Sequence, residues 1–546
     1  MRRVLSVVAA AVMVGSGLAT ASAQARTAGN PGHGTPGHHD PGTPAYTPPP
    51  ITWGTCPTTS LQKAGAVCGM LTVPLDYAHP DGQKIQLAVS KIAHKTSDAA
   101  AQGPMLVNPG GPGGSGLGLA RLGASVPHGG GDPYDWIGFD PRGVGRSIPS
   151  LSCDPSYFKA GRPSYNPVTP DIKTYWLDKA AGYAADCKEA GGALLDHDKT
   201  TDWVNDMESI RKALGASQIN YYGFSYGTYL GQVYATLHPD RVRRFVFDGV
   251  VDPRQVWYEG NLAQEKQFDP NADTFFQWVA DNDAAYGLGS DGKAVRKIYY
   301  DTLADLTAHP EADFGPADWN DVFVGAAYYV YDWDYYAHVL ASAAKGDLAP
   351  AKEAYGAPGD ATYATYMAVE CTDAAWPRWK RQEHDADKIA SSAPFLAWNN
   401  TWYNAPCLTW PAAPSKPVDV DGKGVSPILL IEETNDAATP WSGAIEVRKR
   451  FPKSALIEGV GGTTHAGSLS GVSCTDDAIA TYLLTGVVPK RQPGNNRSDL
   501  KCDPVPPPAP TPVAAAATVA PAGSAVHDRL GSGLRKLITD AAMPQP

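Results

Sequence analysis

The segment Gly223-Phe224-Ser225-Tyr226-Gly227 lies between a predicted strand and a predicted helix, and it constrains the fold more than any other part of the sequence. The β-rich run 219–224 ends at the serine, and a helical pattern follows until Pro239. A strand that turns this sharply into a helix needs glycines, because a Cβ on either side would clash. The turn exposes the serine hydroxyl at a helix N-terminus, where developing negative charge is stabilised. We therefore predict that Ser225 is a nucleophile, rather than a solvated serine in an ordinary turn.

A serine nucleophile needs a histidine base and an acid that orients the base. The predicted strand 428–431 is followed by a loop with Asp436 just before a helix, and a later glycine-rich loop presents His465. This order of serine, acid and histidine suits a hydrolase built on a parallel sheet. We predict Asp436 as the acid and His465 as the base. The competing acids are Glu432, Glu433 and Asp477.

Acyl transfer also needs hydrogen-bond donors for the oxyanion. The glycine-rich loop 108–116 directly follows the short apolar strand 105–108, and its glycines allow backbone N–H groups to converge on a small anion. We assign the two donors to the backbone amides of Gly111 and Tyr226. A phosphate-binding P-loop is excluded because no Lys-Ser/Thr pair follows, and the loop also lacks a clean dinucleotide-binding fingerprint.

Strands and helices alternate along most of the chain, which predicts an α/β fold with a mostly parallel sheet. The alternation includes a strand at 134–140, a helix at 200–214 and a strand that begins at 244, and it resumes with a helix at 441–450 and a strand at 455–458. Between them, residues 254–400 are aromatic-rich and largely helical, as expected for an inserted lid. The predicted divisions are a signal peptide (1–25), a disordered leader (26–50), a first core segment (51–253), the lid (254–400), a second core segment (401–502) and a Pro/Ala-rich tail (503–546) that we expect to be dispensable for chemistry.

The N-terminus has the features of a secretory signal peptide. Arg2 and Arg3 precede a mostly apolar stretch, and small residues at 21–25 fit a cleavage site. A membrane anchor is the less favoured interpretation, because the apolar stretch is shorter than a span needs. We predict a secreted, extracellular protein and leave the export route, Sec or twin-arginine, open. The leader histidines are interpreted as part of a solvated linker rather than as a metal site.

The eight cysteines are interpreted in the light of export. None forms a Cys-x-x-Cys pair, and in an oxidising compartment an even number favours disulfides. We predict sequential pairing: 56–68, 153–187, 371–407 and 474–502. With a net charge of −11, the chain lacks the basic surface expected of a nucleic-acid-binding protein. No segment after the N-terminal region resembles a membrane span. No metal or organic cofactor is implied, and the oligomeric state stays open.

These motifs resemble those of the secreted actinomycete tripeptidyl aminopeptidases, which belong to the proline-iminopeptidase-like α/β-hydrolase serine peptidases. The loop Asn-Pro-Gly-Gly-Pro-Gly-Gly is similar to the family's His-Gly-Gly-Pro-Gly oxyanion loop, with Pro109 where the histidine would stand, a departure typical of the secreted branch. Gly-Phe-Ser-Tyr-Gly-Thr, Asp-Gly-Val-Val-Asp-Pro and Asp-x-x-Thr-Pro match that branch as well. The resemblance covers roughly residues 52–502.

The resemblance implies an α/β-hydrolase fold and the removal of short peptides, such as tripeptides, from the free N-termini of peptides and proteins. Ser225, Asp436 and His465 stand in the triad positions. A lid carboxylate then binds the substrate α-ammonium group, and we offer Glu370 first and Asp373 second for this role, against a solvated or salt-bridged lid acid. Two other functions remain open: a secreted esterase or lipase of the same fold, and a non-catalytic binding module, against which the intact triad argues.

Overall fold

The computed structural model describes residues 46–356, 358–512 and 531–542. The predicted signal peptide and most of the predicted leader therefore lie outside the described residues. The last leader residues, 46–50, are described and pack on the core, contrary to the expectation of disorder. The Tyr46 hydroxyl donates to the carbonyl of Thr72 at 2.8 Å, and Pro48 is buried.

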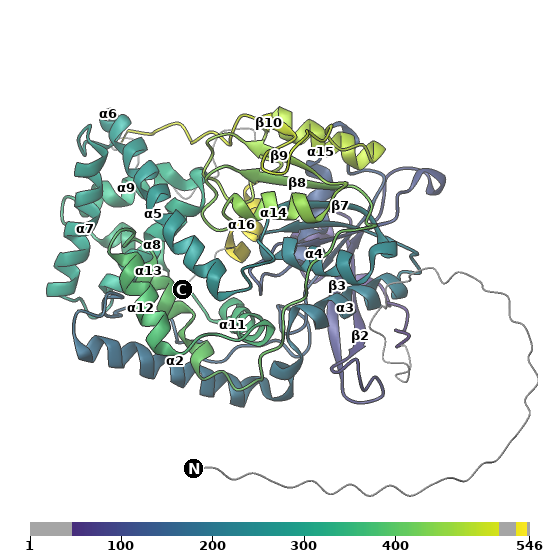
Figure 1. The fold of residues 1–546 in the computed structure, drawn as a ribbon, viewed down its shortest axis with the longest axis horizontal. Helices are drawn as coiled ribbons and strands as arrows, with labels where there is room; N and C mark the ends of the chain where they lie inside the picture. Colours follow the sequence, from purple (N-terminus) through teal and green to yellow (C-terminus); the bar gives the residue numbers. More distant parts are fainter. Residues whose placement is uncertain (1–45, 357, 513–530, 543–546) are drawn as a thin grey trace, which may run out of the picture. The chain divides into compact units, whose positions relative to one another are not determined.

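A ten-stranded sheet forms the core, with the strand order β1-β2-β3-β5-β4-β6-β7-β8-β9-β10 (Figure 1). Strands β1 to β3 and the β3–β5 pair run antiparallel, and every later pair is parallel. This confirms the predicted α/β-hydrolase fold. The strands are Gly54–Thr55, Val67–Pro74, Lys84–Ile92, Pro104–Asn108, Asp135–Phe139, Ile219–Phe224, Val242–Asp248, Ile428–Glu433, Ala455–Gly459 and Leu500–Cys502 for β1 to β10.

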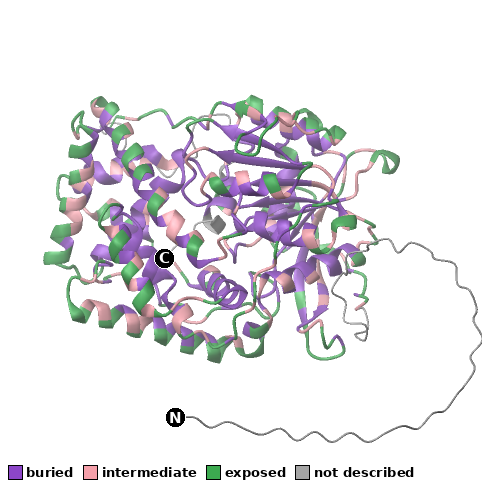
Figure 2. Ribbon diagram, in the orientation of Figure 1, coloured by how far each residue is buried: buried purple, intermediate pink, exposed green. Residues whose placement is uncertain are grey.

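The central strands are buried on both faces, as is usual for parallel sheets covered by helices (Figure 2). The helices of the core are α1 (Thr59–Lys63), α2 (Pro170–Gly191), α3 (Thr200–Ala213), α4 (Tyr226–Leu237), α14 (Ser442–Arg450), α15 (Ser473–Thr485) and α16 (Gly531–Ala542). Short 3₁₀ helices are η1 (Asp98–Ala100), η2 (Leu117–Ser125), η3 (Pro127–Gly129), η4 (Gly192–His197) and η5 (Pro239–Arg241). Helix α2 was not predicted. Within the described ranges, no helix combines the length and the apolar character that crossing a bilayer requires.

The inserted segment between β7 and β8 is helical, as predicted. It holds α5 (Tyr258–Asp281), α6 (Asp283–Tyr286), α7 (Gly292–Ala308), α8 (Pro316–Tyr328), η6 (Val330–Asp332), α9 (Trp333–Ala343), α10 (Ala349–Tyr355), α11 (Ala361–Asp373), α12 (Trp379–Ala390), α13 (Ala397–Tyr403) and η7 (Ala405–Leu408). Most of these helices bury their own aromatic cluster. Helix α11 differs, because its apolar residues join the core of the sheet, and Figure 2 shows it almost wholly buried.

The predicted disulfides are confirmed. The four bonds are Cys56–Cys68, Cys153–Cys187, Cys371–Cys407 and Cys474–Cys502. Each closes a local loop. The third links α11 to η7, and the fourth links α15 to β10.

The described residues of the C-terminal tail pack against the folded chain. The Val505 N–H donates to Glu433 Oε1 at 2.7 Å, and the Thr511 hydroxyl donates to Asp334 Oδ2 at 2.6 Å, so residues 503–512 cross from the core to the lid. In α16, Leu534 and Ile538 are buried in the cluster that also contains residues of η2. These two residues form the buried face of a docked helix.

The buried carboxyl of Asp198 lies just before helix α3. This helix contacts the serine turn, since Thr200 Oγ1 lies 2.8 Å from the Tyr226 hydroxyl. Burial raises the pKa of Asp198 to about 8, against the single hydrogen bond from the Trp203 indole. The folded protein therefore holds one more proton than the unfolded chain between about pH 4 and 8, and stability falls with rising pH across that window.

Asp198→Asn should make the free energy of unfolding less dependent on pH, by up to about 1.4 kcal/mol per pH unit. The difference in free energy of unfolding between the variant and the wild type should therefore favour the variant more at pH 8 than at pH 5. Urea unfolding at both values measures the difference, and Asp196→Asn, at an exposed position of the same turn, is the control. Equal gains at both pH values would contradict the assignment.

Candidate active site

Ser225 sits at a strained turn between β6 and α4. Its backbone has φ 53° and ψ −127°, a conformation that residues other than glycine rarely adopt. A Cβ on Gly223 would lie 2.6 Å from the carbonyl oxygen of Gly227, so a side chain does not fit there. The Ser225 N–H donates to the carbonyl of Asp248 at the end of β7, at 2.9 Å. The serine thus occupies the predicted place, at the carboxyl end of the parallel sheet.

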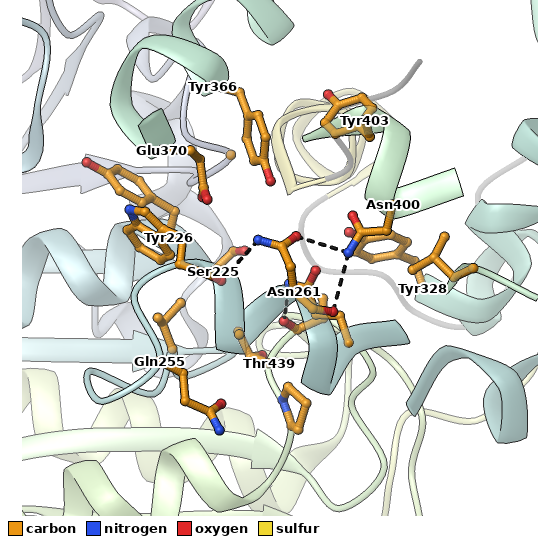
Figure 3. A pocket seen from close by; sticks show the side chains of 18 of the residues that line it. Ser225, Tyr226, Gln255, Asn261, Tyr328, Tyr366, Glu370, Asn400, Tyr403 and Thr439 are labelled. Atoms are coloured by element: carbon orange, nitrogen blue, oxygen red, sulfur yellow. Dashed lines mark hydrogen bonds between the residues drawn. The ribbon is translucent and has the colours of Figure 1, made fainter. Parts of the chain in front are cut away.

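The glycine-rich loop after β4 packs directly on this turn. Gly110 has φ +97°, and a Cβ there would lie 2.5 Å from the carbonyl oxygen of Phe224 and 2.9 Å from Ser225 Cβ. The Tyr226 amide is in the first turn of α4, where helix N–H groups have no intrahelical acceptor. Gly111, Ser225 and Tyr226 line one pocket, a portion of which Figure 3 shows. The structure therefore brings both predicted donor residues into one pocket with Ser225.

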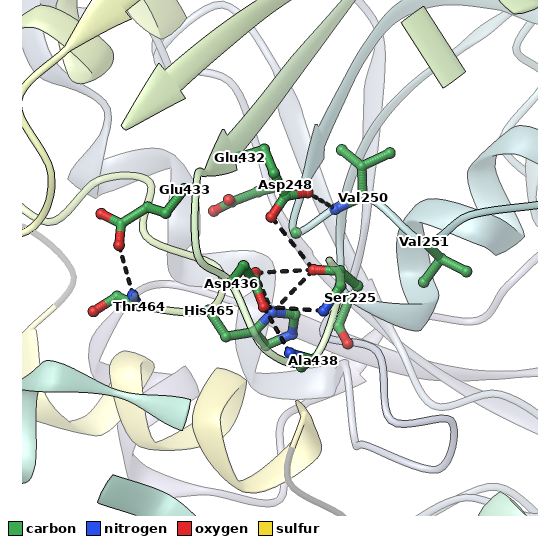
Figure 4. Close-up of polar contacts among 12 residues, drawn as sticks. Ser225, Asp248, Val250, Val251, Glu432, Glu433, Asp436, Ala438, Thr464 and His465 are labelled. Carbon is green, nitrogen blue, oxygen red and sulfur yellow. Dashed lines mark hydrogen bonds and ion pairs between the residues drawn. The ribbon is translucent and has the colours of Figure 1, made fainter. Parts of the chain in front are cut away.

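Asp436 and His465 meet in the loops after β8 and β9. His465 Nδ1 lies 2.7 Å from Asp436 Oδ2, and both side chains are buried (Figure 4). Two backbone amides, of Ala438 and Thr439, donate to Asp436 Oδ1 at 2.8 and 3.0 Å. The Thr439 hydroxyl donates to Oδ2 at 2.9 Å. The carboxylate is thus fixed by donors on both oxygens, in the orientation that holds an imidazole.

The hydrogen bond between Ser225 Oγ and His465 is not formed in the structure. His465 Nε2 is buried and has no hydrogen-bond partner among the described residues. The imidazole packs on Gly249, where a Cβ would lie 2.7 Å from Cε1, and Gly249 follows the residue that binds the Ser225 N–H. Serine–histidine contacts are often long in such sites and tighten when substrate binds.

The competing acids have other partners. Glu432 Oε2 accepts from the Val250 N–H at 2.6 Å, and Glu433 accepts from the N–H groups of Thr464 and Val505 at 2.6 and 2.7 Å. Burial raises the pKa of Glu432 well above its usual range, and that of Glu433 to about 8. Asp477 is exposed and binds His128. Of the four acids, Asp436 is the one that contacts the imidazole.

The pocket around Ser225 is lined by residues of both the core and the lid. The core supplies its floor, with Ser225 and Thr439. Other lining residues belong to the lid and were not predicted from the sequence: Trp257, Asn261, Tyr328, Tyr366, Asn400 and Tyr403. These residues come from α5, α8, α11 and α13 and the segment before α5. No local motif marks them, although the aromatic enrichment of the insertion was visible.

The two lid acids have different surroundings. Glu370 lines the pocket, and its Oε2 has no hydrogen-bond partner among the described residues (Figure 3). Burial, and secondarily the charge of Asp373, raises the pKa of Glu370 well above its usual range. Asp373 does not line the pocket. Its carboxylate accepts from the N–H and the hydroxyl of Thr200, at 2.8 and 2.5 Å, and so anchors the start of α3.

The other acids of the pocket wall are already paired. Asp252 forms a salt bridge with Arg254, and Asp321 forms one with Arg162. Glu370 has no such cation. Among the three acids that line the pocket, it is the one for which the described residues supply no cationic partner.

The sequence is similar to several known hydrolases. Residues 393–497 match a family model described as TAP-like protein. A tripeptidyl aminopeptidase of Streptomyces coelicolor is 39% identical over 83% of this chain and 86% of its own length. The serine protease Hip1 of Mycobacterium tuberculosis is 29% identical over 81% and 90%, and a carboxylesterase B of the same species is 29% identical over 81% and 89%.

Proposed function

Because this chain belongs to the tripeptidyl aminopeptidase family of α/β-hydrolase serine peptidases, we propose that it is a secreted exopeptidase that releases short peptides, tripeptides in particular, from free N-termini. The observation that carries the proposal is Glu370. An unpaired carboxyl in the pocket of the nucleophile suits a substrate whose end bears an ammonium group. The signal-peptide pattern and the four disulfides support export.

The proposed reaction is acyl transfer through a covalent intermediate. His465 Nε2 takes the proton of the Ser225 hydroxyl while Oγ attacks the scissile carbonyl. The backbone amides of Gly111 and Tyr226 donate to the oxyanion of the tetrahedral intermediate. His465 gives the proton to the leaving amine as the C–N bond breaks, and Asp436 stabilises the imidazolium. A water molecule, deprotonated by His465, then attacks the acyl-enzyme and releases the peptide.

Glu370 binds the substrate α-ammonium group in this proposal. A cation beside the buried carboxyl favours its ionised form and opposes the effect of burial on its pKa. The amide of Asn261, which lines the same pocket, interacts with this carboxyl and favours ionisation as well. The distance along the pocket from Glu370 to Ser225 then sets how many residues are released.

N-terminal acetylation tests the proposal. It removes the positive charge, so an acetylated tripeptidyl amide should be cleaved at least about 30-fold less efficiently than the free one, which corresponds to about 2 kcal/mol. Glu370→Gln should lower kcat/KM for the free substrate and narrow the gap between the two substrates. The control is Glu259→Gln, an exposed acid of α5. Equal turnover of both substrates by the wild type would refute the ammonium site.

The similarity to a carboxylesterase makes a second function worth testing. An esterase would hydrolyse a simple aryl ester faster than any peptidyl amide and would be indifferent to N-terminal charge. Assays of aminoacyl, dipeptidyl and tripeptidyl chromogenic amides beside such an ester separate the two functions and give the length of the released peptide.

A further inference from the structure

Helix α5 of the lid lines the pocket near its beginning. In its middle it contacts the loop after β8 that carries Asp436, called the acid loop, and the loop after β9 that carries His465, called the histidine loop. Asn261 lines the pocket, and Asn271, ten residues later on the same helix, is buried at 2% exposure. Pro270, which precedes Asn271, has no N–H to donate to the helix. The same helix therefore reaches both the pocket and the residues around His465.

The Asn271 side chain bridges three separate segments. Its Nδ2 atom lies 2.8 Å from the carbonyl oxygen of Asn435, 3.2 Å from that of Ala327 and 3.5 Å from that of Thr463. Asn435 precedes the proposed acid, and Thr463 is two residues before His465. Its Oδ1 accepts from Gln267 Nε2 of the same helix at 3.3 Å. One amide group thus donates toward the acid loop, the histidine loop and α8.

The histidine loop has further backbone bonds to the lid. The His465 N–H donates to the carbonyl of Tyr328 at 2.9 Å, and the Val330 N–H donates to Thr464 Oγ1 at 3.2 Å. The backbone N–H of the proposed base is therefore bonded to the lid, whereas the Thr464 N–H, one residue earlier, is bonded to Glu433 of β8. The loop that carries His465 is thus held between the lid and the sheet, so the position of the imidazole relative to Ser225 depends in part on the lid.

We propose that Asn271 is a positioning residue that holds the acid loop and the histidine loop in register with the lid, so that a substrate bound by the lid is aligned with the proton relay. The inference rests on the proposed function, which assigns the proton relay to Ser225, His465 and Asp436. Asn271 touches neither Ser225 nor Glu370, so it acts through Asn435 and Thr463. A displacement of about 1 Å of the relay is enough to reduce catalysis about 100-fold, whereas ground-state binding by the pocket walls is retained.

Asn271→Asp and Asn271→Ala test the proposal. The aspartate keeps the shape of the side chain but places an anion against three carbonyl oxygens, and the alanine deletes the donor. We expect kcat on a tripeptidyl amide and the rate of Ser225 labelling by a fluorophosphonate to fall at least about tenfold in both variants, with KM within about twofold. Asn282→Ala is the control, because that amide on the same helix region bonds only within the lid, to the Trp278 carbonyl.

A structural role alone would lower the folded fraction and leave the kinetics of the folded molecules unchanged. Rates are therefore normalised to folded protein by circular dichroism, and Asn271→Asp carries the test if the alanine variant does not fold. Wild-type kcat and labelling rate per folded molecule in the aspartate variant would overturn the proposal. If the wild type is labelled but cleaves no N-terminal tripeptide, the proposed function fails and the labelling rates still test Asn271.

Discussion

Ser225→Ala should abolish both peptidase activity and labelling by a fluorophosphonate, with a loss of at least about 10⁴-fold in kcat. In the proposed reaction, the oxygen of this hydroxyl forms the acyl-enzyme, so alanine at this position leaves the reaction without its nucleophile. The residual rate is what the oxyanion donors and substrate binding supply without a nucleophile. Initial rates on a tripeptidyl amide and gel detection of the labelled protein measure the effect.

The fold should survive this substitution, because alanine fits the space that the serine side chain occupies. Ser392→Ala, at an exposed lid position, is the matched control and should keep full activity and labelling. Ser225→Gly adds a second check. Glycine relieves the strain of a positive φ, so this inactive variant should be at least as stable as the wild type. Persisting activity or labelling in Ser225→Ala would show that another residue is the nucleophile.

Gly110→Ala should reduce kcat about 10²- to 10³-fold, the effect of losing an oxyanion donor. The added methyl group would lie 2.5 Å from the carbonyl oxygen of Phe224 and 3.1 Å from the Tyr226 nitrogen, where no flexible side chain can yield. The loop must therefore move away from Ser225 and take the Gly111 amide with it. The positive φ of Gly110 adds strain to the variant.

Steady-state kinetics on a tripeptidyl amide, with the melting temperature measured in parallel, separates the catalytic effect from instability. Gly359→Ala is the control, since a Cβ there meets no atom within 4 Å and its φ is ordinary. If the Gly110 variant keeps wild-type kcat, the loop does not supply an oxyanion donor.

Local patterns predicted the elements that carry the proposed nucleophile, acid and base. Apolar strands ending at Ser225 and before Asp436, and glycine-rich turns beside Gly111 and His465, are short-range signals, and the structure contains each strand and helix near its predicted bounds. The pairing of cysteines that are neighbours along the chain was predictable for the same reason, because each disulfide closes a local loop.

Long-range packing decided what the patterns could not. Glu370 and Asp373 are both buried acids at the end of α11, and the sequence could only rank them. In the structure, Glu370 lines the pocket, whereas Asp373 accepts a hydrogen bond from the Thr200 N–H at the start of α3. The contact of Val505 with Glu433 could not be predicted either, because an Ala/Pro-rich composition does not show where such a segment packs.

The sequence by itself determined the α/β class of the fold, the strand–serine–helix turn and the order of the acid and base along the chain, because these follow from steric limits and hydrophobic periodicity within short segments. Only the tertiary structure decided that Asp436, and no other acid, contacts His465, that lid side chains wall the pocket and that Asn271 spans three segments. Each of these contacts joins residues far apart along the chain. Their meeting depends on how whole surfaces pack, and no local pattern contains that information.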